Sequence, residues 1–495
     1  MKKLLVLLLA LLMVCSCFVA CGGDDTKETK APSTSKPKVD EYGREYIEDS
    51  IPEDLSFANA NKNTVTFFVR SDYAIAKNEM DTDSTINDTV NDAIFYRNAT
   101  VEDRLGVTIN QISQPGTSET NYNDWLNQLR NAVLTKSGDY DCAAVYASKG
   151  SALAVEGMYY NVKDLDRLDL EKIWWNQSLL DELELFDTLY FLGGDIALSQ
   201  IENAGLIVYN KKIYDEYFTD TDVYQLVRDG EWTIDKLYEM SSQVWVDENN
   251  SGIADDGDIL GYQEMPGSGY IDLWLAALDV KITEFDKEGY PYIAIYNEHS
   301  ISAFEKLKKL NYDNRGASKD VYTRNETKFE NENVLFKADV LTNCKNFRAM
   351  TADFGALPLP KYDTEQESYA TYVQNGCSLI TVLSTCKDSD KDLIGATLEL
   401  MAAESYRQVT PQYYEICLKG KYSTDVEDAE MYDEILKGIK LDFGFIYATL
   451  SINAINTLFR NLEGDFAKSY TEKQIMYEEA LNKLVDRLDE LSFMS

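Results

Sequence analysis

Strand-like and helix-like segments alternate in the first third of the chain, and this alternation constrains the fold most. Residues 63–69 (NTVTFFV) are rich in β-branched and aromatic side chains, which predicts a strand. Apolar side chains at helical spacing predict a helix at 87–105, and a second strand follows at 107–109. A helix at 125–134 and a strand at 140–146 complete the series. This order predicts an α/β fold with a largely parallel sheet.

The alternation continues through the rest of the chain. A length of 495 residues is too great for one compact core, so two or more lobes are expected. Thr233 is the expected N-cap of one later helix. Further strands are predicted at 189–192 and 206–209, and further helices at 234–245, 300–311 and 472–491.

The chain begins with a pattern that directs export. A basic start, Met1-Lys2-Lys3, precedes the unbroken apolar run 4–14. Such a run, followed by small residues, is typical of a signal peptide. It is too short for a transmembrane helix, which needs about 20 apolar residues. We therefore expect residues 1–20 to be removed from the mature protein.

Residues 18–23 (FVACGG) resemble a bacterial lipobox. The resemblance implies that Cys21 becomes the first mature residue and carries a lipid. Phe18 stands where Leu or Val is usual, so Cys17 is the alternative anchor. Residues 21–60 are rich in Asp, Lys, Thr and Ser, and this composition predicts a flexible tether.

The composition argues against several classes of function. With 85 acidic and 47 basic residues the formal charge is −38, and such a surface repels nucleic acid. His299 is the single histidine, so zinc ligation and a Ser-His-Asp arrangement have little support. Carboxylates are abundant, but the sequence does not single out a pair for glycoside hydrolysis. We therefore do not expect an enzyme.

One acidic segment, residues 247–258, has the ligand spacing of an EF-hand calcium loop. Oxygen-bearing side chains occupy positions one, three, five, nine and twelve, and Gly252 occupies the sixth, where the loop must turn sharply. Position twelve is Asp rather than Glu, and no exit helix is expected. The alternative is an acidic surface turn. The expected ligands of a structural calcium ion are Asp247, Asn249, Ser251, the carbonyl of Ile253, Asp255 and Asp258.

Four strings in order resemble the extracellular solute-binding proteins of bacterial ABC importers (family 1 type). They are 140–146 (YDCAAVY), 206–212 (LIVYNKK), 230–233 (GEWT) and 353–361 (DFGALPLPK). The resemblance implies a two-lobe periplasmic-binding-protein-like α/β fold with a hinge and an interlobe cleft. It places an N-lobe at 61–200 plus 355–405 and a C-lobe at 205–352 plus 410–495, with crossings near 198–206, 350–356 and 404–412.

Candidate ligand-binding residues come from the loops that follow strands, because open α/β sheets bind ligands at the carboxyl ends of their strands. Tyr and Trp offer flat faces to a sugar ring, whereas Asp, Asn, Ser and Arg can bind its hydroxyl groups. Each candidate has a structural alternative, such as a core position for Trp274 or an ion pair with Asp353 for Arg348. The candidates are Asp72, Tyr73, Tyr146, Ser148, Asp195, Tyr270, Trp274, Asn343, Arg348 and Asn375.

The resemblance implies a monomeric, lipid-anchored protein on the extracellular face of the cytoplasmic membrane. It would capture a small solute, an oligosaccharide by expectation, through lobe closure and deliver it to ABC permease subunits. Two alternatives stay open at this point. One is a secreted glycoside hydrolase, and the other is a surface carbohydrate-binding protein without a transport role.

Overall fold

The computed structural model describes residues 45–82, 88–255, 257–265, 267–317, 328–347, 349–413, 426–448 and 451–493. Residues 48–495 form one compact unit, separate from residues 1–47. The predicted signal peptide, Cys17, Cys21 and Arg348 lie outside the described residues. Within the described ranges, no helix combines the length and apolar character needed to cross a membrane.

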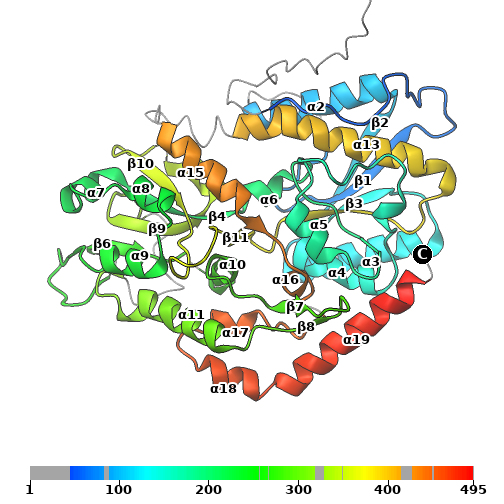
Figure 1. Cartoon of the computed structure of the whole chain (residues 1–495). Helices are drawn as coiled ribbons and strands as arrows, with labels where there is room; N and C mark the ends of the chain where they lie inside the picture. Colours follow the sequence, from blue (N-terminus) through cyan, green and yellow to red (C-terminus); the bar gives the residue numbers. More distant parts are fainter. Residues whose placement is uncertain are drawn as a thin grey trace, which may run out of the picture. The chain divides into compact units, whose positions relative to one another are not determined.

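The first sheet has the strand order β12-β3-β1-β2 and contains the predicted alternation (Figure 1). β1 runs parallel to both β2 and β3, and β12 joins β3 antiparallel. Helices α2 and α13 pack together on one face of this sheet, and α3 and α4 pack together on the other. The strands are β1 (Thr64–Arg70), β2 (Thr108–Gln114), β3 (Cys142–Tyr146) and β12 (Ser378–Val382); the helices are α2 (Thr89–Leu105), α3 (Glu119–Thr135), α4 (Ala147–Val155) and α13 (Lys391–Glu404).

The second sheet has the order β10-β4-β9-β6-β5 and mixed strand directions. β4 is antiparallel to both β9 and β10, whereas β9 and β6 are parallel. Every residue of β4 and β9 is buried, as expected for central strands covered on both faces. The strands are β4 (Gly205–Asn210), β5 (Trp245–Val246), β6 (Ile259–Gln263), β9 (Val334–Val340) and β10 (Phe354–Pro358).

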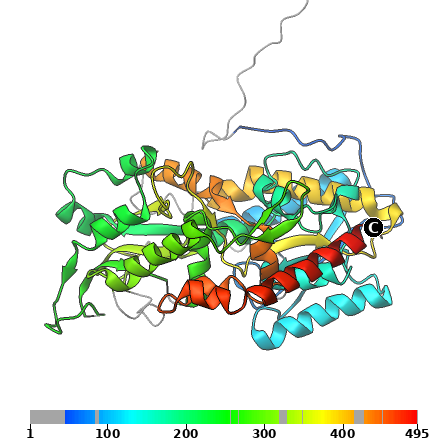
Figure 2. The same cartoon turned by 60° about the horizontal axis from the view of Figure 1, so that its bottom comes forward.

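The remaining helices lie around both sheets and the junction between them (Figure 2). Thr233 caps α9 as predicted, because its hydroxyl accepts the N–H of Lys236. The α-helices are α5 (Gln177–Leu183), α6 (Leu198–Glu202), α7 (Lys211–Tyr217), α8 (Val223–Arg228), α9 (Ile234–Ser241), α10 (Leu273–Ala277), α11 (Glu298–Lys308), α12 (Cys344–Phe347), α15 (Val426–Lys437), α16 (Phe443–Ala448), α17 (Thr457–Arg460), α18 (Phe466–Thr471) and α19 (Gln474–Ser492).

Several short elements complete the described chain. Two small two-stranded sheets join β11 to β13 and β7 to β8. Their strands are β7 (Thr283–Phe285), β8 (Pro291–Ile293), β11 (Thr371–Tyr372) and β13 (Ile439–Lys440). Short 3-10 helices occupy η1 (Val162–Asp164), η2 (Ser268–Asp272), η4 (Leu341–Asn343) and η5 (Asp388–Asp390), and π-helical turns occupy η3 (Lys309–Asp313) and η6 (Ser405–Val409).

Two predicted elements differ from the structure. Residues 189–192 form no strand and contribute an isolated bridge between Leu192 and Ile380. The predicted helix 234–245 ends at Ser241, and Trp245 belongs to β5. The helix ends there because β6 approaches closely: a Cβ added to Gly261 would lie 1.8 Å from the Ser241 carbonyl oxygen.

The chain crosses between the two sheets at residues 203–205 and again between β10 and β12. Ala204 forms a bridge with Val373, and the N–H of Gly205 donates to the Thr371 hydroxyl at 3.2 Å. β10 pairs with β4 in the second sheet, so residues 355–358 do not join the first sheet as the predicted boundary had it. The second crossing therefore follows Pro358 rather than lying at 350–356. The other lobe boundaries stay predictions.

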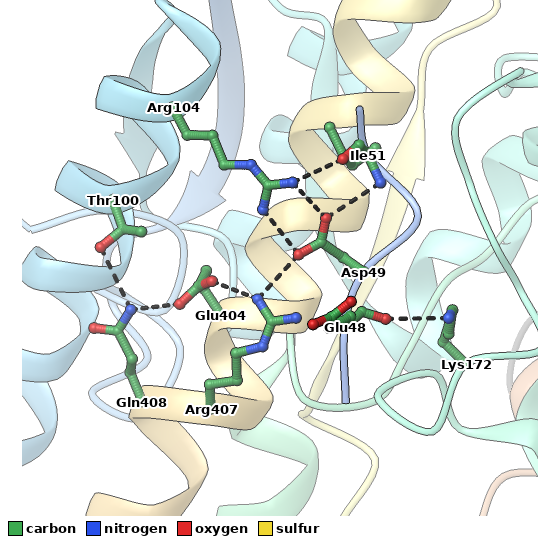
Figure 3. A network of polar contacts seen from close by, with 9 residues as sticks. All are labelled: Glu48, Asp49, Ile51, Thr100, Arg104, Lys172, Glu404, Arg407 and Gln408. Atoms are coloured by element: carbon green, nitrogen blue, oxygen red, sulfur yellow. Dashed lines mark hydrogen bonds and ion pairs between the residues drawn. The ribbon is translucent and has the colours of Figure 1, made fainter. Parts of the chain in front are cut away.

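The beginning of the folded unit is fixed to the first sheet's helices by an ion-pair network (Figure 3). The Asp49 carboxylate accepts hydrogen bonds from Arg104 of α2 at 2.7 and 2.8 Å and from Arg407 of η6 at 3.0 Å. Arg407 also pairs with Glu404 at 2.6 Å. Ile51 is buried beside this network. The end of the predicted tether, from residue 48, thus belongs to the folded unit.

Candidate functional site

The carboxyl ends of β1 and β3 carry a stack of three side chains. The two strands are parallel and adjacent, so Arg70 and Tyr146 end at the same edge, and Tyr73 lies in the loop after β1. The Arg70 guanidinium carbon lies 5.0 Å from the Tyr73 ring centroid and 4.8 Å from that of Tyr146. Arg70 is only 1% exposed, so both cation–π contacts are desolvated and favourable.

Residues 375–378, at the start of β12, accept hydrogen bonds from this stack. Arg70 Nη2 donates to the Gly376 carbonyl at 2.7 Å and to the Ser378 hydroxyl at 3.2 Å. The Tyr146 hydroxyl donates to the Asn375 side-chain oxygen at 3.4 Å. The structure therefore brings three predicted ligand residues together: Tyr73, Tyr146 and Asn375.

Arg70 was absent from the predicted ligand residues, although one signal points to it. A basic side chain that ends a buried strand of a strongly acidic chain is unusual, and strand ends are where such folds bind ligands. Burial lowers the pKa of Arg70, whereas the charge of Glu79 opposes that effect. Its Nε and Nη1 atoms are buried without a hydrogen-bond acceptor.

Tyr73 reaches the crossing between the sheets. Its hydroxyl donates to the Asn203 side-chain oxygen at 2.8 Å. Burial raises the pKa of Tyr73 well above its ordinary value, against the opposing charge of Arg70, and Tyr270 raises it further. Tyr270 belongs to η2, outside the first sheet, so this predicted residue also lies near Tyr73.

Two predicted ligand residues near the second sheet, Trp274 of α10 and Asn343 of η4, bond to other side chains of the protein. Trp274 is 1% exposed, and its indole N–H donates to Glu264 at 3.0 Å. Asn343 donates to Asp339 at 2.7 Å, and Asp339 pairs with buried Lys337 at 2.8 Å. Trp274 and Asn343 thus make protein contacts in this form, and their ligand role stays a prediction.

Three other candidates, Asp72, Asp195 and Ser148, make no side-chain hydrogen bond with the tyrosine stack among the contacts of the described residues. Asp72 accepts the N–H groups of Gly116 and Thr117 at 2.8 and 3.0 Å. Partial burial tends to raise the pKa of Asp72, but the hydrogen bonds prevail and hold it at about 2. Asp195 accepts a hydrogen bond from the Thr410 hydroxyl. Ser148 lies in the first turn of α4, and its buried hydroxyl has no hydrogen-bond partner.

The predicted calcium loop forms a compact turn before β6. Asp247 accepts the N–H groups of Ser251 and Gly252 at 3.0 and 2.9 Å, and Gly252 has the positive φ of 78° that the turn requires. Asp255 accepts the N–H of Gly257 at 2.8 Å. Among the residues that the structure describes, which exclude Asp256, no three Asp, Glu, His or Cys side chains are grouped to hold a metal ion.

The twelfth position of this loop, Asp258, is the most unusual of its residues. Asp258 is 1% exposed, and its Oδ2 accepts the Trp245 indole N–H at 2.9 Å and the N–H of Asp255 at 3.3 Å. Its Oδ1 is buried and has no hydrogen-bond partner. Buried carboxylate oxygens normally have a partner, so this atom is open to a further ligand.

Comparison with known proteins establishes the fold. No protein-family model matches this chain, and no curated protein sequence does. An ABC substrate-binding protein from Listeria monocytogenes, in complex with cycloalternan, aligns with a TM-score of 0.51 at 14% identity, over 87% of this chain and 99% of that one. A cyclo/maltodextrin-binding protein complexed with maltotetraose aligns with a TM-score of 0.51 at 12% identity, over 87% of this chain and 97% of that one.

The alignments cover almost the whole length of both solved chains. The two mixed sheets of this protein therefore have the periplasmic-binding-protein fold that ABC solute-binding proteins share. The predicted fold class is confirmed.

Proposed function

We propose that this protein is an extracellular solute-binding protein of an ABC importer and that its solute is an oligosaccharide. The observation that carries the proposal is the Tyr73–Arg70–Tyr146 stack at adjacent strand ends of this fold. The two structurally similar proteins were solved with a cycloalternan and a maltotetraose. In this role the protein binds and releases its solute without covalent chemistry.

The chemistry of the stack suits a sugar. Tyr73 and Tyr146 are partly exposed, so each ring can offer a flat apolar face to the C–H side of a pyranose. Amide groups of Gln374 and Asn375 lie at the tyrosine hydroxyls and can bind hydroxyl groups of a sugar. Closure of the lobes around the solute would follow from contacts to both lobes at once, since a ligand shifts an equilibrium only by its differential affinity.

Calorimetric titration with matched panels of oligosaccharides and peptides tests this function. The wild type should bind at least one oligosaccharide, and Y73A and Y146A should each weaken it about tenfold, or about 1.4 kcal/mol. Y217A, which removes an exposed tyrosine of α7 distant in sequence from the stack, serves as the control. Release of new reducing ends from a polysaccharide, with no binding of any intact oligosaccharide, would favour the hydrolase alternative instead.

Membrane attachment through Cys21 and delivery to permease subunits belong to the same proposal. The export signal and the lipobox-like residues 18–23 support attachment at the extracellular face of the cytoplasmic membrane. Mass spectrometry of the mature N-terminus should find a lipid on Cys21. C21S should release the protein into the medium, and a C17S variant should stay attached; the reverse pattern would identify Cys17 as the anchor.

We further propose that the loop 247–258 binds calcium as a structural ion. Its EF-hand spacing and the unpartnered Oδ1 of Asp258 support this proposal. Binding would require Asp247 and Asp255 to exchange backbone N–H bonds for the ion. Calcium should raise the melting temperature of the wild type relative to a chelator, and D258N should abolish that rise, whereas D54N at an exposed position should keep it. An unchanged melting temperature would identify the segment as an acidic turn.

A further inference from the structure

We propose that Asn203 couples the ligand-facing ring of Tyr73 to the crossing between the lobes. This inference rests on the proposed function, because it assumes that a solute contacts Tyr73. It assigns Asn203 the role of a positioning residue. The carrying observation is the 2.8 Å hydrogen bond from the Tyr73 hydroxyl to the Asn203 side-chain oxygen, between residues 130 positions apart.

Asn203 is hydrogen-bonded to both chain segments that meet at the crossing, helix α6 and residues 373–374. Its side-chain N–H donates to the Ser199 carbonyl at 2.7 Å, and its own carbonyl accepts the N–H of Gln374 at 3.0 Å. It is 2% exposed, so these contacts are shielded from water. The side chain of one buried residue therefore links Tyr73 to helix α6, and its backbone links α6 to the returning segment 373–374.

The residue after Asn203 continues this link into the second sheet. Ala204 forms a bridge with Val373, and its carbonyl accepts the N–H of Leu341 at 3.0 Å. Leu341 directly follows β9, a central strand of the second sheet. A displacement of Asn203 would therefore also displace Leu341, the residue that follows β9.

The loop that carries Tyr73 has a second attachment to the same helix. Buried Glu79 accepts the N–H of Ser199 at 3.1 Å. The Ser199 hydroxyl in turn accepts the N–H of Ser378 at 2.9 Å, and the Ser378 hydroxyl accepts a hydrogen bond from Arg70. The ring stack and the crossing thus share one buried hydrogen-bond network.

Tyr146 provides a matched contrast. Its ring also contacts the Arg70 guanidinium, but its hydroxyl donates to Asn375 at 3.4 Å and not to the crossing residues 203–204. Removing either hydroxyl leaves an aromatic ring for a solute to contact. The loss at Tyr73 should also free Asn203 from the ring, and the loss at Tyr146 should not.

The test compares Y73F with Y146F, using an oligosaccharide that the wild type binds. Calorimetry gives the affinity, and small-angle X-ray scattering gives the radius of gyration with and without saturating solute. Y73F should bind about fivefold more weakly, about 1 kcal/mol, and its radius should contract less than that of the wild type at saturation. Y146F should contract as fully as the wild type.

The outcomes separate this inference from the function beneath it. If the wild type binds and Y73F contracts as fully as Y146F, the coupling is absent while the solute-binding function stands. If Y146F loses contraction to the same degree as Y73F, the effect belongs to the stack and not to Asn203, and the inference again fails. If the wild type binds no solute at all, the function and the inference fall together.

Discussion

The folded structure shifts the pKa values of two carboxylates, Asp49 and Glu399, in opposite directions. The Asp49 carboxylate accepts hydrogen bonds from Arg104 of α2 and Arg407 of η6, and its side chain is only 5% exposed. Burial alone would raise the pKa of Asp49, but the bonds and charges of Arg104 and Arg407 lower it overall. Glu399 on α13 is the opposite case, because burial raises its pKa to about 7 against the hydrogen bonds from Asp169 and Trp175.

D49N should destabilise the folded unit by about 2 kcal/mol, because it leaves the partly buried Arg104 and Arg407 without their shared charge. The pKa of Asp49 is lowered in the folded state, so its contribution is full above the unfolded pKa near 4 and is lost as pH falls through the folded value. The difference in the free energy of unfolding between D49N and the wild type, measured with urea, should therefore be larger at pH 7 than at pH 3. D388N removes an exposed carboxylate and should cost less than about 0.5 kcal/mol. Equal effects of the two variants would contradict this role for Asp49.

E399Q should flatten the dependence of stability on pH. The folded pKa of Glu399 is above its unfolded value, so its contribution is complete below about 4.5 and declines as pH rises to about 7. Between pH 4.5 and 7.5 the wild type should lose about 2 to 3 kcal/mol more than E399Q, measured by urea unfolding across that range. The exposed-site variant E305Q should follow the wild-type profile. A profile for E399Q parallel to that of the wild type would show that the pKa of Glu399 is the same in the folded and unfolded states.

At the scale of elements, close backbone approaches set boundaries that a local pattern does not contain. The hydrophobic spacing of 234–245 is helical throughout, yet α9 stops at Ser241 because β6 passes against its end. Gly261 allows this approach, and its N–H donates to the Gly316 carbonyl at 2.9 Å. The contact at this boundary joins Ser241 and Gly261, 20 positions apart and in different elements, so the helical pattern of 234–245 does not contain it.

G261A tests this contact. The added methyl group would lie 1.8 Å from the Ser241 carbonyl oxygen, so backbone must move, and we expect a loss of about 3 kcal/mol in the free energy of unfolding. G269A provides the control, because no atom lies within 4 Å of its built Cβ. Calorimetric melting of both variants gives the comparison. A melting temperature for G261A equal to that of G269A would mean that the helix end adapts without cost.

Some residues of the candidate site could be predicted from local sequence patterns, and others could not. Tyr73 and Tyr146 could be predicted because Tyr73 follows β1 and Tyr146 ends β3, and the strand character of both segments is local. Arg70 ends β1 itself, but its place between two rings depends on the pairing of β1 with β3. Asn203 depends on contacts with Tyr73 and Gln374, far away in the sequence, so its role emerged only from the fold.

At the scale of the whole molecule, the two sheets behave as parts of one unit because several chain segments join them. The crossings at 203–205 and after Pro358 lie beside each other through the bridge of Ala204 with Val373. α19, at the end of the described chain, packs against α4 of the first sheet, where Arg487 donates to the Val155 carbonyl at 3.1 Å. A solute held by both lobes should therefore stabilise the whole unit.

Saturating solute should raise the free energy of unfolding by about 2.7 kcal/mol at a hundredfold excess over the Kd. Differential scanning calorimetry with the tightest oligosaccharide of the binding panel measures this rise as a shift of one cooperative transition. A non-binding sugar of equal length is the control. If the solute shifted only part of a split transition, the lobes would unfold independently and solute contacts would be confined to one of them.

The hydrogen bond between Trp245 and Asp258 has a practical consequence. The other five tryptophans, Trp125, Trp174, Trp175, Trp232 and Trp274, are at most 1% exposed, whereas Trp245 is partly open to solvent. Its indole donates to the carboxylate that ends the acidic loop. Quenching by iodide or acrylamide would thus act first on the emission of Trp245, which makes this residue a built-in fluorescent probe of the loop's conformation.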